Sequence, residues 1–267
     1  MPVRIVQSKQ NARVKELRRA LAHPSREPGG LIGIEGPNLV AEALRARLHI
    51  HCVFAAHGTD QHLEALGVSA ATDVLVMSSE LLASSLATET PQPIAALVEP
   101  PRWDWNHLLD SQHVHAPLVV VLAGLQDPGN LGAIVRSAEA FGASGIICLP
   151  GTVSEWNPKA VRASAGSVFR VPVMATGVNQ CFIRLREAGV TILSTAVRAA
   201  RPAHDADLAG PVALLIGGEG GGVPRDLASR ADAAVTVPCP GPVESLNAAV
   251  AAGVLLYEAS RQREGRP

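Results

Sequence analysis

Short apolar runs, each bounded by glycine, proline or polar residues, recur along the second half of the chain. The first, Leu118 to Leu122, is rich in valine and is followed closely by Gly124. A continuous apolar run of this length is typical of a parallel strand buried on both faces. The other strands predicted in this half are 146–149, 190–194, 212–216 and 234–237. Together these runs predict an open parallel sheet of the α/β class.

Helix signals follow the first of these strands. Asp127 and Asn130 both suit an N-cap, and apolar residues then recur at helical spacing. Arg136 points away from the apolar face and lies one turn after Gly132. A glycine inside a helix costs about 1 kcal/mol relative to alanine, so Gly132 indicates that something approaches the backbone beside Arg136. The alternative is that Arg136 pairs with Glu139 on a solvated surface.

The amino-terminal half alternates strands with helices. The predicted strands are 31–34, 50–55, 74–77 and 94–98, and the predicted helices are 14–21, 38–47, 61–66 and 79–87. This alternation predicts a small α/β/α sandwich.

The stretch from Pro100 to Pro117 breaks the alternation. It holds three histidines together with Trp103 and Trp105, which either pack at a domain or subunit interface or stack on bases. We expect two domains, 1–100 and 117–267, joined by a linker at 101–116.

Composition and charge narrow the class of protein. Hydrophobic residues make up 47% of the chain and charged residues 18%, which describes a globular protein with an ample core. The formal net charge of -1 carries no global nucleic-acid signature, so any RNA site must be a local patch. No apolar run approaches the roughly 18 residues of a membrane span, and the basic start lacks the apolar core of a signal peptide. We expect a cytoplasmic protein without membrane contact.

Neither the cysteines nor the histidines indicate a metal site. The four cysteines are far apart in the sequence and are typical of buried thiols in a reducing compartment. His49 with His51, and His113 with His115, are spaced two apart, which also places both members of a pair on one strand face. Neither pair belongs to a recognisable set of four ligands, so no metal is expected.

A basic patch opens the chain. The first 20 residues hold six Lys or Arg, including Lys9, Arg13 and Lys15, and a single acid, Glu16. Such a patch is either solvated or contacts phosphates. Arg162 lies in a second basic segment, at the start of a later helix, and the same two interpretations apply to it.

Unusual residues gather where three predicted strands meet the loops that follow them. The segment 127–136 follows the first strand, the glycine-rich segment 217–222 follows 212–216, and the segment 238–247 follows 234–237. In an open α/β sheet, ligands bind at the carboxyl ends of the strands.

These three segments resemble motifs one, two and three of the SpoU (TrmH-like) RNA ribose methyltransferases, a branch of the SPOUT superfamily. The matching residues, in family order, are Asn130, Gly132 and Arg136, then Gly217, Glu219 and Gly220, then Ser245, Leu246 and Asn247. The segments 34–36 and 90–93 resemble the family's substrate-binding domain, which is related to ribosomal RNA-binding proteins, although ordinary turn chemistry explains both equally well.

The resemblance implies a fold, an activity and partners. The fold would be a SPOUT-type parallel sheet with a deep trefoil knot, preceded by a small α/β/α substrate-binding domain; knots are too rare for any sequence pattern to suggest one. The activity would be transfer of a methyl group from S-adenosylmethionine to a ribose 2′-hydroxyl, in 23S ribosomal RNA or alternatively in transfer RNA. The protein would be a homodimer.

The resemblance also assigns roles to residues. Those implied in catalysis are Arg136, Asn130, Glu219, Ser245 and Asn247. Those implied in cofactor binding are Thr195, Gly217, Gly218, Val237, Pro238, Leu246 and Asn247. Those implied in RNA binding are Lys9, Arg13, Lys15 and Arg162.

The family proposal makes Arg136 the base, but a guanidinium with a pKa above about 12 is a poor base at neutral pH. We expect Arg136 to hold the adjacent phosphate and to stabilise the developing alkoxide, with the proton passing to Glu219 or to water. Asn130 and Ser245 would orient the reacting groups.

Two other functions are compatible with parts of the sequence. Gly218-x-Gly220 follows a strand, as in dinucleotide-binding proteins, but Val223 and Pro224 stand where a helix should begin directly. A catalytically silent RNA-binding relative is the second alternative, which the intact motif residues oppose.

Overall fold

The structure is a computed structural model that describes residues 2–24, 30–69, 71–86, 88–109, 116–197 and 200–264. The chain forms two compact units. Unit 1 comprises Met1–Arg102 together with Trp156–Phe169, and unit 2 comprises Trp103–Glu155 and Arg170–Pro267. The segment 156–169 therefore packs with unit 1, although the predicted ranges place it in 117–267. Whether 1–100 and 117–267 act as separate functional domains stays a prediction.

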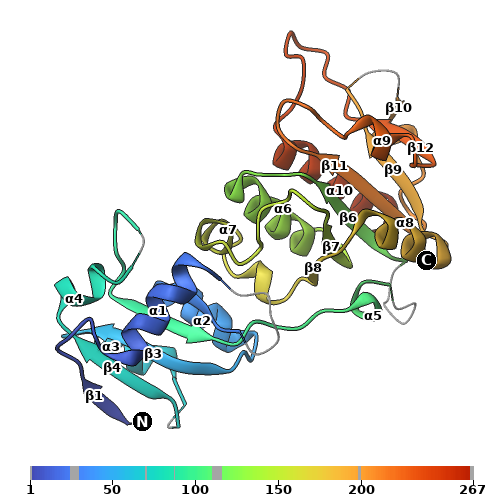
Figure 1. Ribbon diagram of the computed structural model, residues 1–267. Coiled ribbons are helices and arrows are strands. Elements are labelled where there is room, and N and C mark those ends of the chain that lie inside the picture. Colours follow the sequence, from blue (N-terminus) through green and yellow to red (C-terminus); the bar gives the residue numbers. More distant parts are fainter. Residues whose placement is uncertain are drawn as a thin grey trace. The chain divides into compact units, whose positions relative to one another are not determined.

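Unit 1 is built on a five-stranded sheet (Figure 1). Its strands are β1 (Val3–Ile5), β2 (Ile32–Glu35), β3 (Ile50–Ala56), β4 (Asp73–Met77) and β5 (Ile94–Val98). The spatial order is β1-β4-β3-β5-β2, and β5 runs antiparallel to both of its neighbours while the β1–β4 and β4–β3 pairs are parallel. The carboxyl ends of the other four strands therefore share an edge of the sheet with the start of β5. The four predicted strands are confirmed within a residue or two, whereas the short exposed strand β1 was not predicted.

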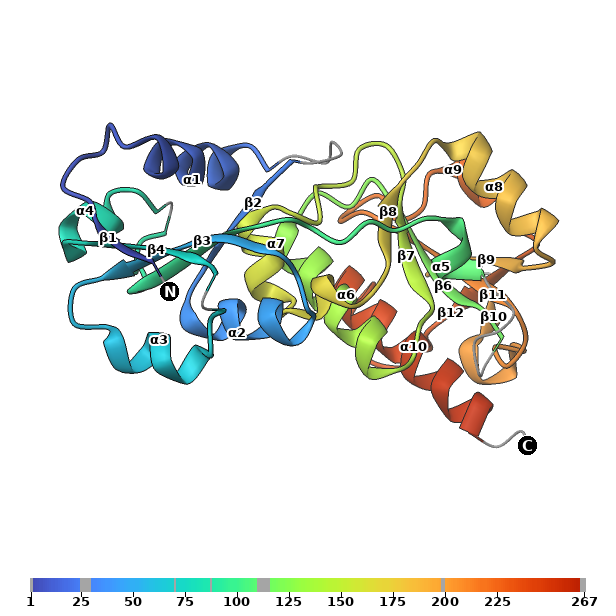
Figure 2. The same cartoon turned by 90° about the horizontal axis from the view of Figure 1, so that it is seen from below.

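Helices cover both faces of this sheet. They are α1 (Ala12–Ala22), α2 (Pro37–Arg45), α3 (Asp60–Leu66), α4 (Ser79–Ala83) and α7 (Pro158–Ala163), followed by the 3-10 turn η1 (Ser167–Phe169). Figure 2 shows α1 and α4 on one face and α2 and α3 on the other, which is the predicted α/β/α sandwich. Helix α4 ends at Ala83, earlier than predicted, and Ala87 lies outside the described residues. Helix α7 packs against the edge strand β2.

Unit 2 contains a seven-stranded, wholly parallel sheet. Its strands are β6 (Leu118–Ala123), β7 (Gly145–Cys148), β8 (Val173–Ala175), β9 (Thr191–Thr195), β10 (Arg201–Pro202), β11 (Val212–Gly217) and β12 (Ala233–Thr236). Their spatial order is β10-β12-β9-β11-β6-β7-β8. The predicted parallel α/β sheet is confirmed; β8 and β10 are additional strands. The trefoil knot stays an expectation from the resemblance.

Helices also cover both faces of the second sheet. They are α5 (Trp105–Leu109), α6 (Pro128–Ala140), α8 (Val178–Glu187), α9 (Arg225–Ala228) and α10 (Ala248–Glu264), with the 3-10 turn η2 (Ala203–Asp205). Helices α6 and α10 pack against each other on one face, and α5, α8 and α9 cover the other (Figure 2).

Helix α5 lies within the predicted linker. Its Trp105 is partly buried against the core of unit 2, so this tryptophan packs inside the fold. The histidines His113 and His115 of the same stretch lie outside the described residues. Within the described ranges no helix is long and apolar enough to cross a membrane, and no three His, Cys, Asp or Glu side chains form a group that could hold a metal.

The thiols follow the prediction in part. Cys52, Cys148 and Cys181 are buried, and Cys239 is half-buried. Burial raises the pKa of Cys52 and of Cys181 to about 12, so both thiols stay protonated.

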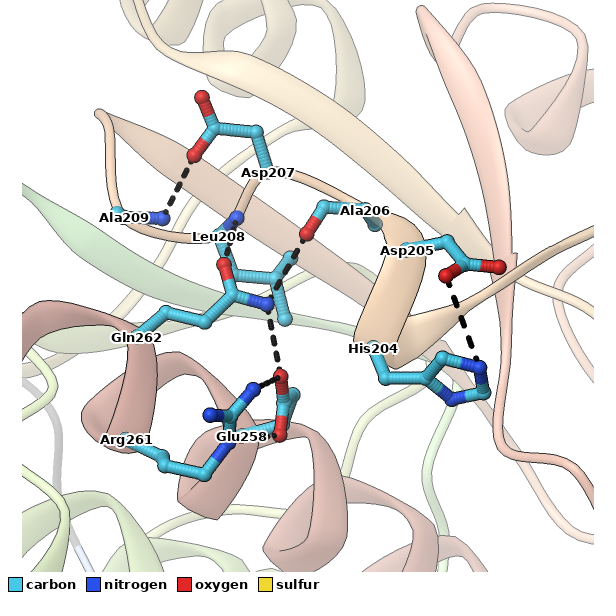
Figure 3. A network of polar contacts seen from close by, with 9 residues as sticks. All are labelled: His204, Asp205, Ala206, Asp207, Leu208, Ala209, Glu258, Arg261 and Gln262. Atoms are coloured by element: carbon cyan, nitrogen blue, oxygen red, sulfur yellow. Dashed lines mark hydrogen bonds and ion pairs between the residues drawn. The ribbon is translucent and has the colours of Figure 1, made fainter.

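The carboxyl end of α10 is tied to the loop before β11 (Figure 3). Gln262 accepts a hydrogen bond from the Leu208 amide at 2.9 Å and donates one to the Ala206 carbonyl at 3.1 Å. Arg263 is only 7% exposed and donates to the carbonyls of Leu208 and Gly210, among others. These contacts hold the carboxyl end of α10 against the loop before β11. Because a helix is rigid, they also help to fix where its amino end lies.

Candidate functional site

The predicted cofactor residues lie at one edge of the second sheet. Strands β12, β9, β11 and β6 are parallel neighbours, so their carboxyl ends are adjacent. Thr195 ends β9, Gly217 ends β11, and Val237 and Pro238 directly follow β12. The Thr195 hydroxyl donates to the Leu215 carbonyl at 3.0 Å, which fixes its rotamer while leaving its oxygen able to accept.

The loop after β11 requires glycine because it doubles back over the strand end. A Cβ atom at Gly217 would lie 1.9 Å from the Gly222 carbonyl carbon. A Cβ atom at Gly218 would lie 2.7 Å from the Gly124 carbonyl oxygen. Gly220 and Gly222 have φ of +78° and +61°, which side-chain-bearing residues rarely adopt. The result is a surface of bare backbone at the end of the sheet.

Motif one begins at the amino end of α6. Asp127, and not Asn130, is the N-cap, because its carboxylate accepts from the Asn130 amide at 2.8 Å. The Asn130 side chain is thereby left to make other contacts. Its Nδ2 donates to Glu219 Oε1 at 2.5 Å, and its Oδ1 accepts from Asn247 Nδ2 at 3.1 Å.

A single chain of hydrogen bonds thus joins all three motifs, although Glu219 and Asn247 lie 89 and 117 residues from Asn130 in the sequence. The amino end of α10 decides which side-chain atoms donate and which accept in these hydrogen bonds. Asn247 Oδ1 accepts from the amides of Ala249 and Val250 at 2.9 and 3.3 Å, so its amide nitrogen must face Asn130. Asn130 therefore presents its oxygen to Asn247 and its nitrogen to Glu219.

Arg136 is exposed on α6 and, among the described residues, makes no hydrogen bond or ion pair. Glu139, the partner in the alternative surface interpretation, instead receives hydrogen bonds from Arg170 at 2.5 and 3.1 Å. The Arg136 guanidinium is therefore available to an external anion. Gly132, one turn earlier, is buried.

Ser245 and Leu246, the other predicted residues of motif three, directly precede Asn247 but do not take part in its hydrogen bonds to Asn130. Ser245 is exposed and makes no hydrogen bond to another described residue. Leu246 is half-buried, as an apolar wall of a ligand site would be. An orienting role for Ser245 stays a prediction.

The four predicted RNA-binding residues all belong to unit 1. Lys9 and Lys15 are exposed and make no ion pair with a described residue. Arg13 is paired with Glu16 at 2.8 Å, one turn along α1, and this hydrogen bond raises the pKa of Arg13. Arg162 is exposed on α7 without a described partner. Arg13 is therefore the least available of the four.

The two segments that resemble a substrate-binding domain are in contact. Glu35, only 5% exposed at the end of β2, accepts from the Thr88 hydroxyl at 2.6 Å and from the Gln92 amide at 2.9 Å. Gly36 follows with φ of +101° and is the N-cap of α2. The conformation of the loop before β5 thus depends on Glu35.

Thr152, at the edge of the second sheet, is a residue that was not predicted to belong to the site. Its hydroxyl accepts from the Gly124 amide at 3.1 Å and donates to the Leu122 carbonyl at 3.0 Å. The available signal is weak: Gly151-Thr152 lies shortly after the strand β7, which ends at Cys148.

Two family models match the chain. The SpoU rRNA methylase family model matches residues 117–257, and the MRM3-like substrate-binding domain model matches residues 11–96. The first match contains all three motifs, and the second contains Glu35 and the loop it holds.

Whole-length relatives agree with these matches. A 23S rRNA (guanosine(2553)-2′-O)-methyltransferase, RlmP from Bacillus subtilis, is 30% identical over 94% of this chain and 97% of its own length. The crystal structure of the SpoU methyltransferase AviRb from Streptomyces viridochromogenes in complex with AdoMet has a TM-score of 0.85 at 29% identity, covering 97% of this chain and 100% of that chain. An AdoMet-bound rRNA methyltransferase from Sinorhizobium meliloti has a TM-score of 0.83 at 32% identity, covering 97% of this chain and 98% of that chain.

Proposed function

This chain belongs to the SpoU rRNA methylase family, and we infer that its substrate is 23S ribosomal RNA, in which it methylates a ribose 2′-hydroxyl with S-adenosylmethionine as methyl donor. The 23S substrate rests on the relatives, and the structural observation that carries the methyl-transfer activity is the hydrogen-bond chain Glu219–Asn130–Asn247. It holds the polar residues of three distant motifs together, and Arg136, on the same helix as Asn130, has no described partner. A chain that had lost its activity would have no need to keep this arrangement.

The bare backbone at the strand ends fits the proposed cofactor. Main-chain amides and carbonyls around Gly217 and Gly218 can read the edge of an adenine, and Leu246 can cover its face. Val237 and Thr195 would complete the site from the neighbouring strands. S-adenosylmethionine supplies an electrophilic methyl group on its sulfonium; these residues bind and orient it.

The remaining requirement lies at the attacking oxygen, because a ribose hydroxyl is hardly acidic. Arg136 would hold the adjacent phosphate and stabilise the charge that develops on that oxygen. Asn130, held from both sides, orients Glu219, and the proton passes to Glu219 or to water. Comparing the pH–rate profiles of wild type and Glu219→Gln separates these two routes, because only proton transfer to Glu219 makes the acidic limb depend on that carboxyl group.

Unit 1 would provide RNA affinity. The exposed Lys9 and Lys15, with Arg162 on α7, give it local positive charge despite the near-neutral chain. We place the enzyme in the cytoplasm, where a ribosomal RNA substrate is found.

We further propose that the enzyme is a homodimer in which a second copy covers the outer face of α6 and α10. Val250, Val254 and Tyr257 of α10 are 52%, 39% and 56% exposed, although all three are large and apolar or aromatic. They follow one another at helical spacing, and Phe141 at the end of α6 extends the patch, its ring 5.8 Å from that of Tyr257. Exposed apolar patches of this kind typically mark interfaces.

Sedimentation velocity at micromolar concentration tests the dimer. Wild type should sediment as a dimer, and Val254→Arg should shift it towards monomer. Ile183→Arg is the matched control, because Ile183 is 54% exposed on α8, on the other face of the sheet, and should leave the dimer intact. A wild-type monomer, or dissociation by both variants, would refute this interface.

Calorimetry and an RNA assay test the activity. S-adenosylmethionine should bind and nicotinamide dinucleotides should not, and labelled methyl groups should be transferred to ribosomal RNA in the presence of a chelator. Binding of a dinucleotide in place of S-adenosylmethionine would overturn the assignment, and label confined to transfer RNA would overturn the 23S proposal.

A further inference from the structure

Three strand-exit loops interlock at the edge of the second sheet that carries the motifs. They are the loop after β6 at Gly124, the loop after β7 at Gly151 and Thr152, and the loop after β11 at Gly218. Gly124 has φ of +73° and Gly151 has φ of +86°, so both chains turn sharply where they leave the sheet. A Cβ atom at Gly151 would lie 3.6 Å from the Gly124 Cα, which shows how closely the two backbones approach.

Thr152 provides the side-chain link in this arrangement. Its hydroxyl oxygen accepts from the Gly124 amide at 3.1 Å, and its hydroxyl hydrogen is donated to the Leu122 carbonyl at 3.0 Å. Thr152 therefore contacts the end of β6 both as a donor and as an acceptor. The next residue adds a main-chain bond, from the Val153 amide to the Leu125 carbonyl at 2.8 Å. The chain direction after β6 therefore depends on the β7 loop.

That direction decides where motif one lies relative to motif two. The loop held by Thr152 leads within a few residues to Asp127, the N-cap of α6, and to Asn130. On its other side, the Gly124 carbonyl packs against Gly218, whose Cβ would approach it to 2.7 Å. The Asn130–Glu219 hydrogen bond spans these same two loops, and it has little tolerance for displacement because hydrogen bonds weaken steeply with distance and angle.

We propose that Thr152 is a positioning residue for methyl transfer: its hydroxyl fixes the exit of β6 and so holds Asn130 against Glu219 at the reacting site. The inference rests on the proposed function. Thr152 does not need to touch the cofactor or the RNA, so its contribution belongs to the rate of the chemical step.

Thr152→Val tests this role, because it keeps the shape of the side chain and removes the hydroxyl. The expected result is a loss of about tenfold or more in kcat at saturating S-adenosylmethionine and RNA, since one donor and one acceptor lose their partner. The Kd for RNA should stay within about twofold, and Thr152→Ser, which restores the hydroxyl, should recover most of kcat.

Thr176→Val is the matched control. Thr176 is also half-buried, follows β8 on the same sheet and hydrogen-bonds the Gln180 side chain at 2.9 Å, but β8 lies at the far edge from motif two. Its loss should leave kcat unchanged.

A Thr152→Val enzyme with undiminished kcat, or with a lowered melting temperature and normal kcat, would overturn the inference. An equal loss of kcat in Thr176→Val would overturn it too. If wild type itself transfers no methyl group to RNA, the proposed function fails instead.

Discussion

Truncating Arg136 to alanine should lower kcat strongly and leave the stability of the fold nearly unchanged. The side chain is exposed and unpaired among the described residues, so Arg136→Ala leaves no buried group without a partner. Its effect on the free energy of unfolding should therefore stay within about 0.5 kcal/mol. If the guanidinium stabilises charge on the attacking oxygen, the loss of one preorganised donor should cost about 10² to 10³ in kcat, or roughly 3 to 4 kcal/mol.

Single-turnover methylation of saturating RNA measures this rate, and calorimetry measures the affinity for S-adenosylmethionine, which should not change. Arg136→Lys should recover little, because an ammonium lacks the planar fork of donors. Arg170→Ala is the control. Arg170 pairs with Glu139 of α6, the helix that carries Arg136, so the substitution should lower stability and leave kcat unchanged. An Arg136→Ala enzyme of undiminished rate would show that the site is assigned wrongly.

Three further substitutions test other parts of the structure. Asn130→Asp sets a carboxylate against Glu219 where an amide now donates, and steady-state assays should show a fall of about tenfold to 100-fold in kcat with little change in RNA affinity; equal activity would refute the hydrogen-bond chain. Hydrogen bonds from Arg261 lower the pKa of Glu258 to about 2, from 4.5. Because the folded-state pKa is depressed, this carboxylate stabilises the fold fully above about pH 4.5 and loses its effect as the pH falls towards about 2. Glu258→Gln should therefore lower the melting temperature by about 2 °C at neutral pH, and the difference from wild type should shrink as the pH falls. A constant difference across that range would contradict the assignment. Lys15→Ala should reduce the salt dependence of RNA binding by about one ion without changing kcat at saturating RNA; an unchanged salt slope in filter binding would exclude Lys15 as a phosphate contact.

The strands could be predicted from the sequence because burial on both faces demands continuous apolar runs, and Ile94–Val98 is found with the predicted bounds. Strands β8 and β10 were missed because three and two residues are too few to form a pattern. Strand β1 was missed because it is a three-residue edge strand with every residue exposed, so burial imposes no pattern on its sequence. Helix α5 was assigned to the linker because five residues between prolines and polar residues carry no helical period.

The motifs could be brought together in prediction because parallel strands end at one edge of a sheet. What holds them together could not be predicted, since the Glu219–Asn130–Asn247 chain depends on three rotamers. The contact of Thr152 with the β6 exit likewise depends on backbone positions far apart in sequence. By contrast, the pairing of Arg13 with Glu16 was predictable from their spacing of three residues along a helix.

Mapping the methyl group tests the central claim most directly. Purified enzyme, S-adenosylmethionine and protein-free 23S ribosomal RNA should yield a ribose 2′-O-methylated nucleotide, located by ribose-methylation-sensitive sequencing and identified by mass spectrometry of nucleosides. The same RNA treated with Arg136→Ala enzyme should remain nearly unmodified at that position. A methyl group on a base, or ribose methylation found in transfer RNA and absent from 23S ribosomal RNA, would contradict the account.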